Sequence, residues 1–418
     1  METSSSAHQL DVLTGVRALA ALWVFVFHSW LAGGSPTVRV SILPQPIDLS
    51  PLAAFGWLGL DVFFVLSGFL LTRQAFFKAE RSVATSRSTG FAAAFGEKYS
   101  SYLCRRILRV YPAYYACLTA LLLLGATGIY LLLPGKLELL LHLGMIHNFI
   151  EQYIATMNGV FWTLPFEWQF YLIFPCLFIV LRRYGAWVLY GSVLIGVIGT
   201  KLLVMATNDG YPQVLLPIRL DTFAAGMCAG AYAFHRPPAR IIAATMFWVG
   251  LIGLLTTPWV FTGYEHVGHY YDLKGFVRPL WIQASICLML LGLTGERHLG
   301  IRIFDNRVAV ALGLISYSIY LFHVPILELL PTLGLIPQRT ASIQVGWPRI
   351  LATALPLVLL VSAMSYWFVE RIFQTRYKPT KRAARPRPVV WRFFVLDPIV
   401  VLIIWAIALE LFLFLKGD

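Results

Sequence analysis

Charged residues are scarce in this chain of 418 residues, because Asp, Glu, Lys and Arg together make up only 13% of it. About a quarter is usual for a soluble domain. Hydrophobic residues reach 58% and aromatic residues 15%, and the mean hydropathy is +0.72. The shortage of charge excludes an ordinary soluble domain and indicates a protein that crosses a membrane many times.

Cysteine is scarce too, and the few cysteines follow no framework. All five lie in or beside apolar segments without a Cys-x-x-Cys pair: Cys104, Cys117, Cys176, Cys228 and Cys287. This spacing predicts neither disulfide bonds nor a zinc site, so we expect no metal. The N-terminal residues METSSSAHQLD lack the basic segment of a signal peptide. We therefore expect the first apolar run to remain as a membrane span.

Long apolar runs take the place of the missing charge. Runs of about twenty residues predict eleven membrane spans, near residues 12 to 31, 53 to 72, 110 to 133, 163 to 181, 186 to 206, 212 to 234, 241 to 261, 278 to 294, 309 to 330, 349 to 370 and 393 to 415. The predicted fold is all-α, a polytopic transmembrane helix bundle with a ten-helix core plus one appended C-terminal helix. Its parts are a membrane domain at 1 to 377, a basic Pro-rich cytoplasmic linker at 378 to 392 and an additional transmembrane helix at 393 to 418.

Positive charge is distributed unevenly along the chain. The 33 Lys and Arg outnumber the 20 Asp and Glu, and the formal net charge is +13. Most of these cations lie in alternate connections, above all between residues 73 and 109 and between 371 and 392. This positive-inside pattern predicts a cytoplasmic N-terminus and a C-terminus on the outer side of the membrane. Nucleic-acid binding is not expected, because the chain has no motif for it.

Two ionisable residues in the first span, Arg17 and His28, are eleven positions apart. On a helix they share one face and lie about 16 Å from each other. In the second span, Asp61 lies about 18 Å above Arg73 by the same rise, which predicts a depth near that of His28. A carboxylate beside a histidine supports general-base chemistry. The alternative is that Asp61 satisfies a buried polar group at a helix contact near Ser67.

Four more polar groups are expected in the outer half of the bundle. Glu167, Arg219, Asp221 and His323 lie about 22 to 26 Å above the nearest cytoplasmic arginine, if the helices are straight. Charged groups at this depth usually face a cavity, a partner or a pathway. Arg219 and Asp221 either bind substrate or form a structural ion-pair network. His323 either serves the site or is a hydrogen-bonded residue of the bundle.

A basic cluster is expected where the second and third spans meet the cytoplasm: Arg73, Arg105, Arg106 and Arg109. Such clusters bind phosphates or the headgroups of anionic lipids, and lipid contact alone is one interpretation. The other is a phosphate-bearing donor held by these arginines. An arm as long as the pantetheine of coenzyme A would span the roughly 16 Å to His28.

Five motifs occur in order along the expected spans: Arg-x10-His at 17 to 28, Gly-x-Asp-x-Phe-Phe-x-x-Ser-Gly-Phe at 59 to 69, Arg-Arg-Ile-x-Arg-x-Tyr-Pro at 105 to 112, Trp-Thr-Leu-x-x-Glu at 162 to 167, and Ser-Tyr-Ser-Ile-Tyr-Leu-x-His ending at His323. Over residues 10 to 376 the chain therefore resembles the acyltransferase 3 family of bacterial membrane O-acyltransferases. The resemblance implies transfer of an acyl group, often acetyl, from cytoplasmic acyl-CoA to a hydroxyl of an envelope or exported carbohydrate. It also implies that Arg17 and His28 are essential.

The chain departs from the family pattern in two places. Trp168 stands where many members have a second acidic residue, which puts in doubt any role that needs two adjacent carboxylates. The periplasmic esterase-like domain fused to some members is not expected here.

The leading hypothesis is an O-acyltransferase of the bacterial inner membrane. His28 is its general base, Asp61 orients His28, and Glu167 is a further catalytic residue. Five arginines would bind acyl-CoA, the co-substrate: Arg17, Arg73, Arg105, Arg106 and Arg109. Arg219, Asp221 and His323 would bind a carbohydrate or glycolipid acceptor, and membrane lipids surround the bundle.

Several alternatives remain at the level of the sequence. Direct transfer and a covalent acyl-histidine both fit, whereas Ser67 as a nucleophile has no expected base at its depth. A transporter or flippase of a lipid-linked sugar or acyl donor would also place polar groups inside a bundle. A structural partner of a polysaccharide synthase is the third class.

Overall fold

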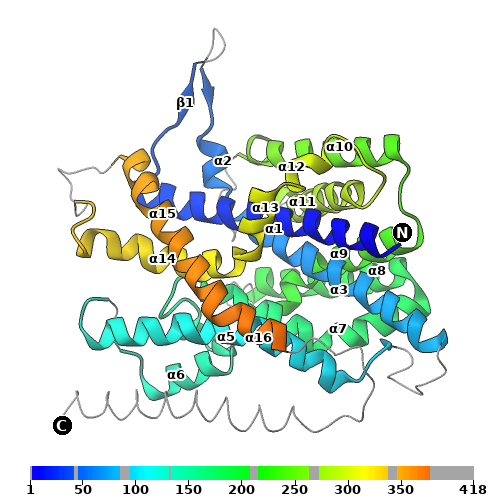
Figure 1. Ribbon diagram of the computed structural model, residues 1–418, viewed down its shortest axis with the longest axis horizontal. Helices are drawn as coiled ribbons and strands as arrows, with labels where there is room; N and C mark the ends of the chain where they lie inside the picture. Colours follow the sequence, from blue (N-terminus) through cyan, green and yellow to red (C-terminus); the bar gives the residue numbers. More distant parts are fainter. Residues whose placement is uncertain are drawn as a thin grey trace.

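The structure, a computed structural model, describes residues 2 to 41, 46 to 84, 95 to 130, 133 to 207, 215 to 262, 273 to 337 and 346 to 376. Helices dominate these residues. The two short strands found among them, β1 (Arg39–Val40) and β2 (Ile47–Asp48), pair antiparallel in a hairpin that projects from the bundle (Figure 1). The predicted helical class is confirmed. The linker at 378 to 392 and the appended helix at 393 to 418 lie outside the described residues.

The helices follow in chain order as α1 (Glu2–Ala32), α2 (Ser50–Ala54), α3 (Leu58–Ala84), α5 (Tyr99–Ala126), α6 (Lys136–Leu143), η1 (His147–Phe149), η2 (Glu151–Tyr153), η3 (Phe161–Thr163), α7 (Leu164–Tyr184), α8 (Ala186–Thr207), η5 (Leu216–Arg219), α9 (Leu220–His235), α10 (Arg240–Val260), α11 (Leu273–Leu293), α12 (Ile301–Phe304), α13 (Arg307–Leu314), α14 (Ser316–Thr332), α15 (Trp347–Ser365), η6 (Tyr366–Glu370) and α16 (Arg371–Arg376). η6 is a π-helix that continues α15 into α16.

Six of the described helical segments are long and apolar enough to cross a membrane: Asp11–Ala32, Leu58–Arg81, Tyr99–Ala126, Phe161–Tyr184, Arg240–Val260 and Trp347–Thr375. α13 and α14 pass the same test together but meet at a 67° bend. Two apolar helices are shorter, Ala186–Leu202 and Val277–Leu293. The structure thus supports a polytopic membrane protein, while the predicted count of ten core spans is not confirmed.

Glycines set how closely the helices approach one another. A Cβ atom at Gly68 of α3 would lie 2.2 Å from the carbonyl oxygen of Phe223 in α9. A Cβ atom at Gly226 of α9 would lie 2.0 Å from the carbonyl oxygen of Val65. Small residues allow such backbone contact between membrane helices. We call this close contact between α3 and α9 the glycine seam.

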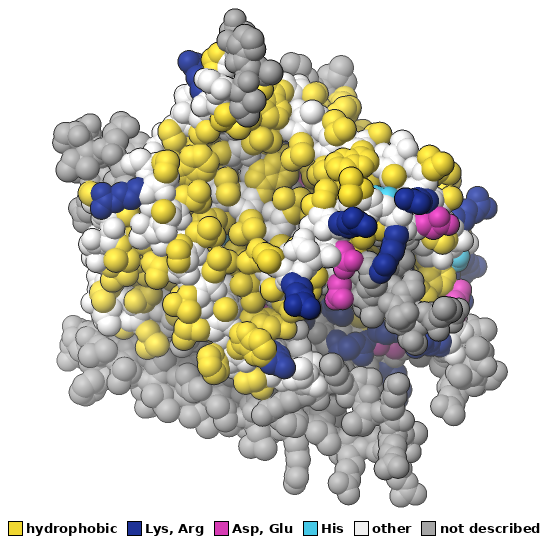
Figure 2. Space-filling model, turned by 45° about the horizontal axis from the view of Figure 1, so that its top comes forward, with side chains coloured by type: hydrophobic (Ala, Val, Ile, Leu, Met, Phe, Trp, Pro, Cys, Tyr) yellow, Lys and Arg dark blue, Asp and Glu magenta, His cyan; other side chains and the backbone are white. Residues whose placement is uncertain are grey.

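The surface divides into an apolar belt and a charged end. Figure 2 shows hydrophobic side chains over a broad belt, and a group of Lys, Arg, Asp and Glu at the end of the molecule where α1 begins. Large apolar side chains such as Trp187 and Ile195 are exposed. This is the division expected of a helix bundle whose sides face lipid and whose end faces water.

Candidate functional site

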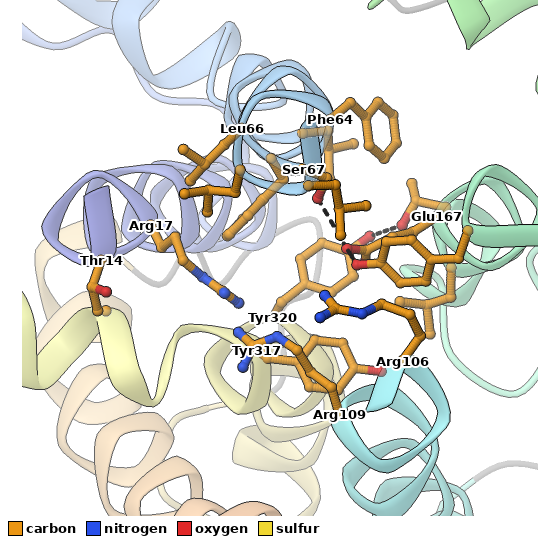
Figure 3. A pocket seen from close by; sticks show the side chains of 18 of the residues that line it. Thr14, Arg17, Phe64, Leu66, Ser67, Arg106, Arg109, Glu167, Tyr317 and Tyr320 are labelled. Carbon is orange, nitrogen blue, oxygen red and sulfur yellow. Dashed lines mark hydrogen bonds between the residues drawn. The ribbon is translucent and has the colours of Figure 1, made fainter. Parts of the chain in front are cut away.

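A cavity of about 280 Å³ lies inside the bundle between α1, α3, α5, α7 and the bend from α13 to α14. Three guanidinium groups point into it, those of Arg17 from α1 and of Arg106 and Arg109 from α5 (Figure 3). Residues of η6 and α16 complete its wall. The cavity therefore brings together side chains that are up to about 360 residues apart in the sequence, as a folded site must.

Positive charges close together in an apolar interior repel one another, and nearby anions are needed to offset this repulsion. The Nε of Arg17 donates to the hydroxyl of Ser316 at 3.3 Å. Arg106 lies over the ring of Tyr171, 5.7 Å from its centroid. Two carboxylates, those of Glu167 and Glu370, interact electrostatically with Arg17. Of the charged side chains that line the cavity, three are arginines and one is a carboxylate, that of Glu167, so the cavity is net positive and suits an anionic ligand.

The carboxylate of Glu167 lies in this cavity. It accepts hydrogen bonds from the hydroxyl of Ser67, at 3.1 Å, and from the hydroxyl of Tyr171. The prediction that Glu167 belongs to a separate outer layer is wrong, and so is the expectation that Ser67 has no base nearby. Each depth was measured from a different arginine along a straight helix, whereas the helices of a bundle are tilted.

Of the five arginines predicted to bind the donor, the structure places two outside the cavity. Arg105 forms an ion pair with Glu97, whose other carboxylate oxygen lies 2.7 Å from Lys78. Arg73 lies over the ring of Phe69 at 5.8 Å. Arg105 and Arg106 are neighbours in sequence, but successive helical positions are about 100° apart. Arg106 therefore faces the cavity while Arg105 faces Glu97.

His28, the predicted base, pairs with His323. Its Nδ1 lies 3.0 Å from the carbonyl oxygen of Val24 and 3.1 Å from Nε2 of His323. The two rings meet edge to face, with centroids 4.9 Å apart. The centroid of the Tyr320 ring is 5.9 Å from that of His323, and Tyr320 also lines the arginine cavity, so it lies between the two. The histidine pair is thus separated from the arginine cavity by one aromatic ring.

Asp61 does not contact His28, so the prediction that it orients His28 is wrong. Its carboxylate lies 3.5 Å from Nη1 of Arg219, and both side chains are buried. The level of α3 explains the difference, because a Cβ atom at Gly59 would lie 2.3 Å from the carbonyl oxygen of Ala20. Ala20 is about two turns below His28 on α1.

Asp61, Arg219 and Asp221 belong to one buried polar network. The amide of Gln283 donates to Asp221 at 2.8 Å, and the hydroxyl of Tyr190 donates to Gln283 at 2.7 Å. None of the network residues lines the cavity. For Arg219 and Asp221, these contacts favour the structural interpretation over acceptor binding.

Two residues at the site were not predicted from the sequence: Tyr171, which lines the cavity, and Glu370, which interacts electrostatically with Arg17. Tyr171 could have been found, because it stands four positions after Glu167 on a helix and such residues are neighbours. Glu370 could not. It is buried on the π-helix η6 and accepts a hydrogen bond from Ser318 at 2.6 Å. π-helices are rare and are frequently found at functional sites, and the apolar periodicity of the sequence does not predict them.

A second histidine pair lies outside the membrane-spanning segments. The rings of His142, in α6, and His147, in η1, stack with centroids 4.0 Å apart, and both are fully buried. Burial lowers the pKa of His142 to about 3 and that of His147 to about 4. Both are therefore neutral at physiological pH. Among the described residues, no cluster of three or more His, Cys, Asp or Glu could hold a metal ion.

The fold and the site together define a helical membrane protein with an arginine-lined cavity next to a histidine pair. The profile of the Acyltransferase domain of the acyltransferase 3 family matches residues 10 to 368, and the chain belongs to that family.

Three relatives show the range of similar proteins. A Staphylococcus aureus protein named "Putative O-acetyltransferase" is 24% identical over 395 residues, which cover 87% of this chain and 57% of the relative. "Putative membrane-bound transacylase BcsY" of Komagataeibacter xylinus is 25% identical, covering 86% and 81%. A "Putative acetyltransferase" of Acidianus two-tailed virus is 24% identical, covering 77% and 84%. The chain thus spans little more than half of the staphylococcal relative, and no solved structure matches.

Proposed function

We propose that this protein is a membrane O-acyltransferase that moves an acyl group, acetyl in the simplest case, from acyl-CoA to a hydroxyl of an envelope or exported carbohydrate. The observation that carries the proposal is the placement of Arg17 and His28. Arg17 points into a cationic cavity, and His28 lies about 16 Å further along the same helix, paired with a second histidine. Family membership and the names of the relatives support the same chemistry.

The donor would enter the cavity from the charged end of the bundle. We assign this end to the cytoplasmic side of a bacterial inner membrane. Ligand pockets usually measure about 300 to 1,000 Å³, so a cavity of about 280 Å³ holds only part of an acyl-CoA. Arg17, Arg106 and Arg109 would bind its anionic or polarised oxygens. The acceptor carbohydrate would approach His28 from the opposite, outer end.

In direct transfer, His28 takes the proton from the acceptor hydroxyl as the oxygen attacks the thioester carbonyl. The new C–O bond forms, the C–S bond breaks, and the departing thiolate of coenzyme A takes the proton from His28. General-base catalysis of this kind typically contributes about 10² to 10⁴ in rate.

A two-step route has support from a separate observation, the contact between Ser67 and Glu167. In that route Glu167 accepts the proton of Ser67 as the serine oxygen attacks the thioester carbonyl. The C–S bond breaks and the departing thiolate takes the proton from Glu167, which leaves an acyl-serine and free coenzyme A. Glu167 then takes the proton of the acceptor hydroxyl as that oxygen attacks the ester; the bond to Oγ of Ser67 breaks, and Ser67 takes the proton back from Glu167. Both routes give the same overall reaction.

The function is tested with membranes that contain the full chain and acetyl-CoA labelled in its acetyl group. We expect label to enter the carbohydrate fraction and to be released from it by mild alkali, as an ester is. His28→Ala should lower this transfer by about 100-fold or more. His235→Ala, at the end of α9 and away from the cavity, is the matched control and should keep it.

Two results would contradict the proposal. Full transfer by His28→Ala would remove His28 from the role of base. Movement of an intact lipid-linked sugar across the membrane, with no labelled ester formed, would instead favour a transporter.

A further inference from the structure

We propose that His323 is a positioning residue, which holds the proton of His28 on Nδ1 and accepts a hydrogen bond from it throughout the reaction. This inference rests on the proposed function, because it concerns how His28 acts as base. It gives His323 the role that the sequence suggested for Asp61. Three hydrogen-bonding groups in a row determine where the protons lie: the carbonyl of Ile319, His323 and His28.

The contacts of His323 show which of its ring nitrogens carries the hydrogen. Its Nδ1 lies 3.0 Å from the carbonyl oxygen of Ile319, and a carbonyl can only accept, so Nδ1 carries the hydrogen. His323 is completely buried, with the rings of Phe25 and Tyr320 beside it. A buried imidazolium without a carboxylate would be costly. His323 is therefore neutral, and its Nε2 is an acceptor.

The contacts of His28 likewise show which of its ring nitrogens carries the hydrogen. Its Nδ1 faces two acceptors, the carbonyl oxygen of Val24 at 3.0 Å and Nε2 of His323 at 3.1 Å. Nδ1 must therefore be the protonated nitrogen, and the lone pair lies on Nε2. Among the described residues, none forms a hydrogen bond with that Nε2. Since His28 is only partly buried, Nε2 is the nitrogen that can meet an acceptor hydroxyl.

His323 adds something that the carbonyl of Val24 does not. The Val24 carbonyl belongs to the same helix as His28 and moves with it, whereas His323 stands on α14. Contact with a second helix fixes the direction of the imidazole ring. When His28 takes a proton and becomes an imidazolium, the hydrogen bond to His323 becomes charge-assisted and stronger. This is the support that the third residue of a catalytic triad gives to its histidine.

The backbone around His323 is itself held in place. Pro325 has no N–H, so it cannot form the helical bond to the carbonyl of Leu321 four residues earlier. That carbonyl instead accepts from the amide of Asn158 at 2.9 Å. The helix is thus anchored to the segment before α7 within one turn of His323.

These contacts also argue against acceptor binding by His323. Both ring nitrogens already have partners, one in Ile319 and one in His28. The side chain is fully buried, so it offers no nitrogen to a carbohydrate.

Two conservative variants separate positioning from mere packing. In His323→Gln the amide reaches the place of Nε2, and its oxygen can accept from His28. In His323→Asn the amide reaches only the place of Nδ1, so it keeps the bond to Ile319 and loses the one to His28. We expect the Gln variant to keep most of the transfer rate. The Asn variant should lose about 10- to 100-fold in kcat, the usual effect of one missing hydrogen bond to a charged group, with KM for acetyl-CoA unchanged.

The double variant His28→Ala/His323→Asn tests whether His323 acts through His28. If it does, the double variant transfers no more slowly than His28→Ala alone, because residues that act as a unit are not additive. Thermal unfolding of each purified variant shows whether it is folded, and the comparison uses variants of equal stability.

Three outcomes overturn the inference. An Asn variant as active as the Gln variant would mean that only packing and the Ile319 bond matter. A raised KM for the acceptor at unchanged kcat would mean that His323 binds the acceptor. Additive losses in the double variant would mean that it acts apart from His28. If His28→Ala is inactive in any of these cases, the proposed function stands and only the role of His323 fails. If the native chain itself forms no labelled ester, the proposed function fails.

Discussion

Two groups of arginines and carboxylates lie within this bundle, one partly buried and one fully buried, and they differ in what the charges face. In the cavity, Arg17, Arg106 and Arg109 point into about 280 Å³ of space. In the polar network, Arg219 and Asp61 instead face each other. A charge inside a membrane protein is costly in both places. In the polar network, the ion pair between Asp61 and Arg219 offsets the cost of burying the two charges. In the cavity, the arginines surround a space in which an anionic ligand could offset that cost.

The comparison teaches that depth in the membrane does not by itself identify a functional charge. Asp61 and Glu167 are both single acids in apolar helices, and both belong to family-like motifs. Asp61 is paired with an arginine and does not line the cavity, whereas Glu167 lines it and contacts a serine. Four predictions test how buried polar groups are used in this bundle, in order of decreasing effect.

The largest effect is expected at the polar network. Asp61→Leu leaves the buried Arg219 without its carboxylate, which typically costs about 3 to 5 kcal/mol. We expect little folded protein in detergent, measured by size-exclusion chromatography and thermal unfolding. The double variant Asp61→Leu/Arg219→Leu removes both charges and should recover much of the folded yield. A well-folded but inactive Asp61→Leu protein would place Asp61 in the site after all.

Glu167→Gln should separate activity from stability. Gln fills the same volume and can still contact Ser67, but it cannot accept a proton. In the two-step route, where Glu167 is the proton acceptor, we expect transfer to fall about 100-fold with an unchanged melting temperature. In the two-step route, Ser67→Ala should also abolish labelling of the protein itself by acetyl-CoA. If protein labelling persists in Ser67→Ala, the serine ester is excluded.

The histidine pair outside the spans gives an effect that depends on pH: near pH 6 it is smaller than the two effects above, and it grows on further acidification. Because the pKa values of His142 and His147 lie below the usual value, the unfolded chain binds more protons than the folded one below about pH 6.5. Stability that is present above that pH should therefore fall on acidification, by about 1.4 kcal/mol per pH unit for each histidine. The loss should continue to about pH 4.

Thermal unfolding between pH 7 and pH 4.5 measures this effect. The double variant His142→Gln/His147→Gln should show a flatter dependence on pH than the native chain. Equal slopes would mean that other groups control the response to acid.

The smallest effect compares two adjacent arginines. Arg106 lines the cavity, so Arg106→Ala should raise KM for acetyl-CoA by about 10-fold, as loss of one charge-assisted contact would. Arg105 pairs with Glu97 near the surface, where such pairs contribute at most about 1 kcal/mol. Arg105→Ala should leave KM unchanged. Similar changes in KM for both variants would show that the donor extends beyond the cavity.

The sequence predicted the members of the site better than their arrangement. Arg17, Arg106, Arg109 and Glu167 were each named from motifs, and the structure brings them into one cavity. The pairing of Asp61 was not predictable by counting residues along helices, because the level of α3 against α1 depends on a backbone contact at Gly59. Close contacts between glycines and carbonyl oxygens of another helix cannot be predicted from the periodicity of apolar residues in the sequence.

The partner of His28 illustrates the same limit. His323 is 295 residues away, and its place depends on the 67° bend between α13 and α14. The sequence marks both histidines as unusual, but only the folded chain shows that one faces the other.

The glycine seam has a consequence for how this protein can change over time. Gly68, in the seam, directly follows Ser67, which faces the cavity. A side chain added at position 68 would push α3 away from α9 and carry the Ser67 hydroxyl out of reach of Glu167. New specificity is therefore easier to gain by substitutions elsewhere in the lining, at Tyr317 or Gln374, than by a larger residue at position 68.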